Sequence, residues 1–173
     1  MLFLIISIIV ISVLGTISHF LYDISNHNKI IGLFSSVNES TWEHIKIALT
    51  PTILWSLIDG LIYRSSYNYF FAKVISLLII IVLMPLLFYG YKYLFKKNNF
   101  IVDILIFYIV IISSQTSFYL LNLVNPVNYF INYISIITIF IIFAFYLLLT
   151  LIPIKNFLFK DPITDKYGFN GHK

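Results

Sequence analysis

Residues 1–22 read MLFLIISIIVISVLGTISHFLY, an apolar stretch that contains no Asp, Glu, Lys or Arg before Asp23. Its length matches the roughly 20 residues that a helix needs to cross the hydrocarbon core of a bilayer. The stretch lacks the basic start and the small-residue cleavage site of a signal peptide. It therefore predicts a membrane-spanning helix that is retained in the mature chain.

Four further apolar runs approach or reach the same length, at residues 47–63, 72–94, 101–121 and 131–153. Together with a first span at 2–22, they predict an all-α fold: a polytopic transmembrane bundle of about five helices within a domain at 1–155. Residues 156–173 would form a cytoplasmic amphipathic tail. The run at 47–63 is the shortest and contains Asp59, so a re-entrant or tilted segment is the alternative there.

The composition excludes several classes of protein. Hydrophobic residues make up 60% of the chain and charged residues 10%, whereas soluble domains typically carry about 25% charged residues. Because Cys is absent, disulfides, thiolate metal sites and cysteine nucleophiles are excluded. The net charge of +4 comes from lysines at the ends of apolar runs, where they address lipid headgroups. We therefore expect membrane lipids as partners, and no nucleic acid; a membrane-protein partner or a homo-oligomer stays open.

The basic residues also predict an orientation, because Lys and Arg are retained on the cytoplasmic side of a membrane. With five spans, the side opposite the first loop receives only Arg64 and Lys73. The side of the first loop receives Lys29, Lys46, Lys92, Lys96, Lys97, Lys155, Lys160, Lys166 and Lys173. The N-terminus is therefore expected outside and the C-terminus in the cytoplasm.

The densest polar cluster, VNESTWEHIK at residues 37–46, directly precedes an apolar run. At helical spacing Glu39 and Glu43 would share one face. Ser40 and Glu43 have the spacing of a capping box, in which both side chains satisfy backbone N–H groups at a helix start. Capping does not account for Glu39, Trp42 and His44 together.

A second polar cluster, His19, Tyr22 and Asp23, ends the first span and should lie at the same membrane level. We predict that His19, Glu43 and His44 are the catalytic candidates, because a histidine beside a carboxylate is suited to acid–base chemistry. Lys46 would neutralise an anionic headgroup and Trp42 would anchor at the interface. The full set of candidate substrate-binding residues is Tyr22, Asn38, Glu39, Trp42 and Lys46.

A divalent metal such as zinc is the alternative use of these side chains, with His19, Asp23, Glu43 and His44 as candidate ligands. A catalytic zinc typically keeps three protein ligands and a water. The chain has no His-x-x-x-His pair, so no single segment supplies a complete site. The cofactor is therefore undecided from the sequence.

Three functions remain open. The first is an enzyme, a hydrolase or transferase that acts on a lipid or lipid-linked group at the cytoplasmic face. The second is a small transporter or channel in which Asp59 and Gln115 mark a polar path; Asp59 could instead turn outward, near Arg64. The third is a non-catalytic subunit of a membrane complex. Few polar residues lie at mid-depth, which favours a one-sided site over a conduit.

Two motifs carry a resemblance to a known family. The first is Val37-Asn38-Glu39-Ser40-x-Trp42-Glu43-His44-x-Lys46, which His19-Phe20-x-Tyr22 precedes and Pro51 follows; the second is Leu158-Phe159-x-Asp161-Pro162 with Tyr167-Gly168. Together they resemble the signature of an uncharacterised family of small bacterial multi-pass membrane proteins. The resemblance implies a location in the bacterial cytoplasmic membrane, and it brings no established activity. The tail could fold over the cytoplasmic mouth of the bundle or lie on the membrane surface as an anchor.

Overall fold

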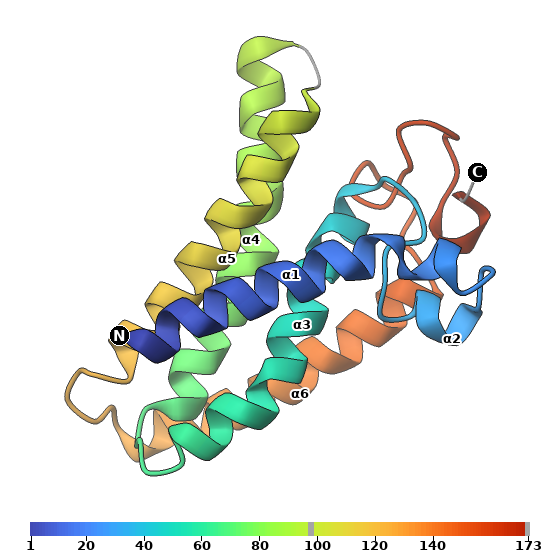
Figure 1. The fold of residues 1–173 in the computed structure, drawn as a ribbon. Helices are drawn as coiled ribbons and strands as arrows, with labels where there is room; N and C mark the ends of the chain where they lie inside the picture. The colour runs from blue at the N-terminus through green and yellow to red at the C-terminus, as the bar shows by residue number, and fades with distance from the viewer. Residues whose placement is uncertain (97–98, 172–173) are drawn as a thin grey trace.

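The long segments of the chain are helices, as the apolar runs predict. The computed structural model describes residues 1–96 and 99–171, and within them five helices are long and apolar enough to cross a membrane. These are α1 (Leu2–Ile24), α3 (Thr41–Ile62), α4 (Tyr69–Phe95), α5 (Phe100–Leu121) and α6 (Tyr129–Leu151). Two short helices, α2 (Lys29–Gly32) and η1 (Gly168–Gly171), lie in the first loop and the tail (Figure 1). The all-α prediction is confirmed.

Helix α3 is the centre of the bundle. It packs against α1 and α4, while α4 also packs against α5 and α6. Of the five long helices, α3 has the largest share of buried residues and the lowest hydropathy. Because protein surrounds its first half, from Thr41 to Thr52, α3 can carry polar side chains there at little cost. It also begins at Thr41, ahead of the apolar run at 47–63, so the polar string enters its first turns.

Helices α1 and α3 approach closely at Gly15. A Cβ atom at Gly15 would lie 2.6 Å from the carbonyl oxygen of Ile47 and 2.6 Å from the ring of Phe107. Pro51, four residues after Ile47, has no N–H to donate to that carbonyl, so the α3 backbone is open at this turn. The contact sets α1 against α3 one helical turn away from the two histidines, His19 and His44.

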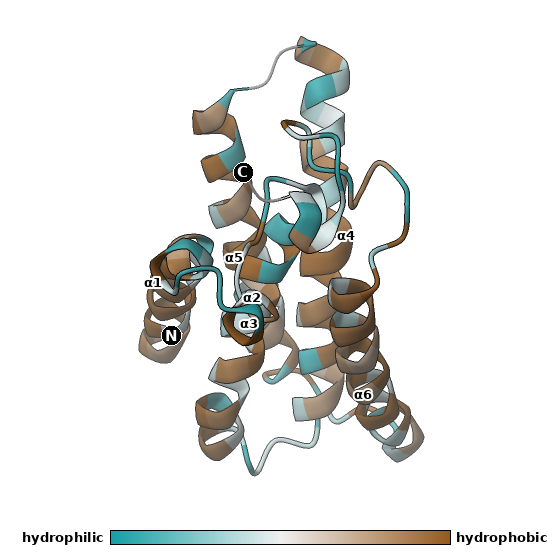
Figure 2. Cartoon of the chain, turned by 90° about the vertical axis from the view of Figure 1, so that its right-hand side faces the viewer, coloured by the Kyte–Doolittle hydropathy of each residue, from teal (hydrophilic) through white to brown (hydrophobic). Residues whose placement is uncertain are grey.

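The outer surfaces of the long helices are apolar. Figure 2 shows α1 and α6 mostly in brown, whereas the loop that leads from α1 to α2 is teal. Exposed side chains on α1 and α6 include Ile9, Val13, Phe140 and Phe145. Such a surface suits contact with lipid chains, which solvate Ile and Phe as well as a protein core does.

Asp59 lies at the end of α3 remote from the polar string, and it does not turn outward to Arg64. Its carboxylate is buried and forms an ion pair with Lys73 of α4, and it accepts a 2.7 Å hydrogen bond from the hydroxyl of Tyr69. An isolated charge is costly inside a bundle, and a cation on the neighbouring helix offsets part of that cost. Lys73 therefore bears little on the orientation.

Two other lysines that the orientation argument counted, Lys97 and Lys173, lie outside the described residues. Lys46 lies inside them but is fully buried. The other lysines on the side of the first loop are exposed or half-buried: Lys29, Lys92, Lys96, Lys155, Lys160 and Lys166.

Candidate functional site

The last part of the segment between α1 and α3, from Ser35 to Ser40, is a largely buried loop that is held by its own polar groups. Ser36 donates its N–H to the carbonyl of Ser18 on α1, and its hydroxyl donates to the carbonyl of Asn38. The Asn38 side chain accepts the N–H of Ser40 at 2.8 Å. These bonds replace the water that the loop backbone would otherwise require, and they fix the path by which the chain enters α3.

Glu43 and Lys46 form a buried ion pair beneath this loop. One carboxylate oxygen of Glu43 accepts hydrogen bonds from the Lys46 ammonium at 2.8 Å and from the N–H of Val37 at 3.0 Å. The ammonium also donates to the carbonyl of Gly32 in α2. Lys46 therefore holds α2 and the loop against α3, and its charge does not face a headgroup.

The capping box predicted for Ser40 and Glu43 is wrong. Ser40 is the N-cap residue of α3, but its side chain makes no capping hydrogen bond. The Glu43 carboxylate is turned to Val37 and Lys46 instead. Glu39 precedes α3, so the shared helix face predicted for Glu39 and Glu43 is also absent. The reason is that the loop folds back over the first turn of α3 and takes up the polar groups that capping would use.

Glu39 lies between two histidines from different helices. Its Oε2 atom lies 3.8 Å from Nε2 of His19 on α1 and 3.9 Å from Nε2 of His44 on α3. One donor atom from each of the three residues falls within 4.8 Å of the others. The side chains are 28%, 44% and 22% exposed for His19, Glu39 and His44, so solvent reaches the cluster.

The ring of His44 has a defined orientation. Its Nδ1 atom lies 3.0 Å from the carbonyl oxygen of Ser40. A carbonyl can only accept, so Nδ1 carries a proton and Nε2 is directed to Glu39. Phe88 of α4 stacks on the other side of the ring, with centroids 6.3 Å apart. The rings of His19 and His44 meet edge to face at 5.9 Å.

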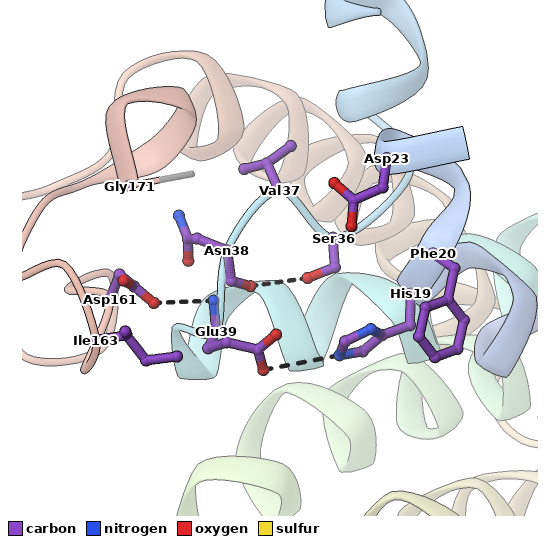
Figure 3. A pocket seen from close by; sticks show the side chains of 10 residues that line it. All are labelled: His19, Phe20, Asp23, Ser36, Val37, Asn38, Glu39, Asp161, Ile163 and Gly171. Atoms are coloured by element: carbon purple, nitrogen blue, oxygen red, sulfur yellow. Dashed lines mark hydrogen bonds and ion pairs between the residues drawn. The ribbon is translucent and has the colours of Figure 1, made fainter. Parts of the chain in front are cut away.

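A cavity of about 220 Å³ opens beside the cluster. Figure 3 shows Glu39 and His19 pointing toward each other at its wall, with Asp23 above them. Asp23 also lies 3.5 Å from His27, so it belongs to the cavity and to the turn after α1. The lining residues are His19, Phe20, Asp23, Ser36, Val37, Asn38, Glu39, Asp161, Ile163 and Gly171.

The tail closes one side of this cavity. Asp161 accepts the N–H of Glu39 at 3.0 Å, and the carbonyl of Gly168 accepts the side-chain amide of Asn38 at 2.8 Å. Phe159 packs on Trp42 with ring centroids 5.0 Å apart. The tail thus folds over the loop, and the two motifs that carried the family resemblance contact each other.

Several residues predicted for substrate binding are used in packing. Trp42 is buried against Phe159 rather than placed at an interface. Tyr22 is buried beside Phe169. The catalytic roles of His19, Glu43 and His44 stay predictions, but the structure groups the two histidines with Glu39 instead of Glu43. No spacing rule could identify Glu39, because its position depends on a tail residue 122 positions away.

An apolar groove of about 460 Å³ runs between α1 and α5. Its walls are Ile8, Ile9, Ser12, Val13, Thr16, Ile17 and Tyr108. At about 100° per residue, the α1 members of this set share one helix face with His19, Phe20 and Asp23. The groove therefore ends about one helical turn from the cavity.

Comparison with known proteins gives a family but no activity. No curated protein and no solved structure matches the chain. A family model does match, and it covers residues 2–169, nearly the whole chain and both motifs. The chain therefore belongs to this family, which is described as a family of unknown function (DUF6512).

Proposed function

We propose that this chain is a membrane-embedded enzyme, a hydrolase or transferase, that acts on a lipid or lipid-linked group. One observation carries the proposal: His19 and His44, from two helices, meet the carboxylate of Glu39 beside a cavity. Ionisable groups at the membrane end of a helix bundle are costly to hold, and function is the usual reason that they persist.

The cluster can perform acid–base chemistry at the wall of the cavity. His19 would accept the proton of a water or an acceptor alcohol while the oxygen of that group attacks the carbonyl carbon or phosphorus of an ester. Glu39 would stabilise the imidazolium that forms. The ester bond to the leaving group then breaks, and the proton passes from His19 to the leaving oxygen, so the reaction needs no redox partner.

The α1–α5 groove supports an amphiphilic substrate. A polar headgroup in the cavity and an acyl or prenyl chain in the groove would lie along one continuous face of α1. An apolar wall next to a few converging polar groups is the usual form of a small-molecule site. A water-soluble substrate would have no use for the groove.

The lysine distribution supports a cytoplasmic location for this site. Among the exposed basic residues of the described ranges, the lysines lie on the side of the cavity, and Arg64 lies on the other side. Reporter fusions at Asn128 and Lys173 test the orientation. We expect an outside signal from Asn128 and an inside signal from Lys173; the reverse pattern would place the site outside the cell.

A transport path has less support. Asp59, the acidic residue that such a path would use, is held by Lys73 and Tyr69. Within the described residues, Gln115 donates to Ser114 of its own helix, and Ser114 bonds to Ser76 of α4. These groups satisfy one another, which is the pattern expected of helix packing.

The lipid composition of cells tests the enzyme proposal. Cells that lack the chain would be complemented with the wild type, His19→Gln, His44→Gln or the control His27→Asn, and their lipid extracts compared by mass spectrometry. Asn suits the control because it tolerates the positive φ of 62° at position 27. We expect the wild type and the control to restore one lipid species, and the His19 and His44 variants to convert it about 100-fold more slowly. The proposal is contradicted if the lipid profile is the same with and without the chain, or if both histidine variants restore the wild-type profile.

A further inference from the structure

We infer that His19, Glu39 and His44 form a binding site for one divalent transition-metal ion, and that Zn²⁺ is the ion that fits best. The inference rests on the proposed function for its chemical role. The binding itself rests only on the geometry of the three side chains.

The spacing of the donor atoms favours an ion between them. Glu39 Oε2 lies 3.8 Å and 3.9 Å from the two imidazole nitrogens, which exceeds the roughly 2.7–3.2 Å of a direct hydrogen bond. In a tetrahedral zinc site with bonds of about 2.0–2.2 Å, neighbouring donors lie about 3.3–3.5 Å apart. Closure by about half an ångström would bring both Glu39 distances into this range, and the donor atoms of the two histidines lie within 4.8 Å of each other.

The orientation of His44 gives independent support. Its Nδ1 proton is donated to the carbonyl of Ser40, so Nε2, which is directed to Glu39, is the nitrogen that would bind a metal ion. A hydrogen bond from the other ring nitrogen to a backbone carbonyl is also how proteins orient metal-bound histidines.

The charges around the cluster suit a cation. Asp23, which lines the same cavity, adds a negative charge nearby. Lys46, the buried cation of the same segment of chain, is neutralised by Glu43 at 2.8 Å. An ion at the cluster would therefore be attracted by the carboxylates of Glu39 and Asp23, and Lys46 would not repel it because Glu43 neutralises its charge.

The ligand types select the metal. Two imidazole nitrogens and one carboxylate oxygen form a set that catalytic zinc sites use, and hard cations such as Mg²⁺ and Ca²⁺ prefer oxygen donors. Three protein ligands leave a fourth position, and His19 and Glu39 both line the cavity where a water can occupy it. A zinc-bound water ionises near neutral pH and would supply the nucleophile in place of a water activated by His19; it would release its proton to solvent, and the leaving oxygen would take a proton from solvent in return.

Metal binding to the purified full chain tests the inference without any substrate. The protein in detergent would be stripped with a chelator and titrated with Zn²⁺ alone, and Co²⁺ would serve as a spectroscopic probe of tetrahedral coordination. We expect one ion per chain. His19→Gln, Glu39→Gln and His44→Gln should each weaken binding by at least about tenfold, and His27→Asn should not.

The variants must be folded for this comparison, which the helical content and elution profile of each in detergent would show. The inference is overturned if the wild type does not bind Zn²⁺ at micromolar concentration, or if all three variants bind it as tightly as the wild type. Tighter binding of Fe²⁺ or Mn²⁺ than of Zn²⁺ overturns the choice of metal. If the chain binds zinc but has no effect on lipids, only the proposed function is contradicted. If the chain converts lipids but binds no metal, only the metal site is contradicted.

Discussion

Two glutamates four residues apart behave in opposite ways. Glu43 is buried, and its carboxylate lies 2.8 Å from Lys46 and 3.0 Å from the N–H of Val37. Glu39 is 44% exposed, and its nearest histidine nitrogens lie at 3.8 and 3.9 Å. Glu43 has short bonds to two partners of fixed position, whereas Glu39 forms longer ion pairs with two imidazoles.

The difference separates a structural ion pair from a ligand site. A buried pair must hold short hydrogen bonds, because each charge has lost its hydration and nothing else replaces it. A cluster that binds an ion or a reacting group needs the opposite arrangement, with donors that converge without touching. Short contacts around Glu43 therefore indicate support of the loop, and the wider spacing between Glu39 and the two histidines matches donors that converge on one point.

The largest expected effect is at the buried pair. Lys46→Met should lower the free energy of unfolding by about 3–5 kcal/mol, because the Glu43 carboxylate is left buried without its cation. Unfolding in detergent with increasing denaturant would measure it. The double variant with Glu43→Gln should recover part of the loss. If the double variant lost as much stability as the two single variants together, Glu43 and Lys46 would not be coupled. Glu43 would then have no structural ion pair, and its contrast with Glu39 would fail.

Gly15→Ala should have the next largest effect. The added methyl group would lie 2.6 Å from the Ile47 carbonyl, so α1 and α3 must separate, at a cost of about 1–3 kcal/mol. The separation moves His19 away from His44 but leaves Glu43 and Lys46 together, since both lie on α3. Zinc titration should show weaker binding; unchanged binding would mean that the crossing does not set the cluster. Gly90→Ala is the control, since a Cβ there has nothing within 4 Å.

Asn38 and Ser40 form a matched pair. Asn38→Ala removes the bonds to Ser40 and Gly168 and should cost about 1–3 kcal/mol. Ser40→Ala should cost less than the roughly 1 kcal/mol of a typical N-cap residue, because its side chain makes no capping bond. Unfolding midpoints compare the two. A greater loss at Ser40 would restore the capping interpretation.

The smallest effect on stability is expected at the cluster. Glu39→Gln should change the free energy of unfolding by less than about 1 kcal/mol, because the carboxylate is partly exposed and its ion pairs are long. The backbone bond from Glu39 to Asp161 is retained. The same variant should lose zinc and lipid conversion. A loss of stability as large as that of Lys46→Met would assign Glu39 a structural role.

The helical part of this molecule could be predicted from hydropathy. A bilayer requires that every backbone group be satisfied within its own helix, so length and apolar composition suffice to locate a span. The prediction was least accurate at α3, which begins at Thr41 instead of residue 47. The first half of that helix is surrounded by protein, so it tolerates polar residues that a lipid-facing helix would exclude.

The candidate site could be predicted only in part. The membrane level of the site could be predicted, because His19 lies at the end of one apolar run and His44 lies just before the next. Sequence distance favours the wrong carboxylate, since Glu43 is adjacent to His44 and Glu39 precedes it by five residues, yet Glu39 is the one that lies between the histidines. The choice depends on whether each residue precedes or enters the helix, and on which way the loop turns.

The sequence by itself determined that the chain is an all-helical protein with five potential spans, because that outcome depends on local composition. Only the tertiary structure decided which polar groups are partners. Glu39 is held by Asp161 and Asn38 by Gly168, across separations of 122 and 130 residues. Hydrogen bonds depend on distances of a few ångströms, and contacts between parts of the chain so far apart are set by packing, which no local pattern records.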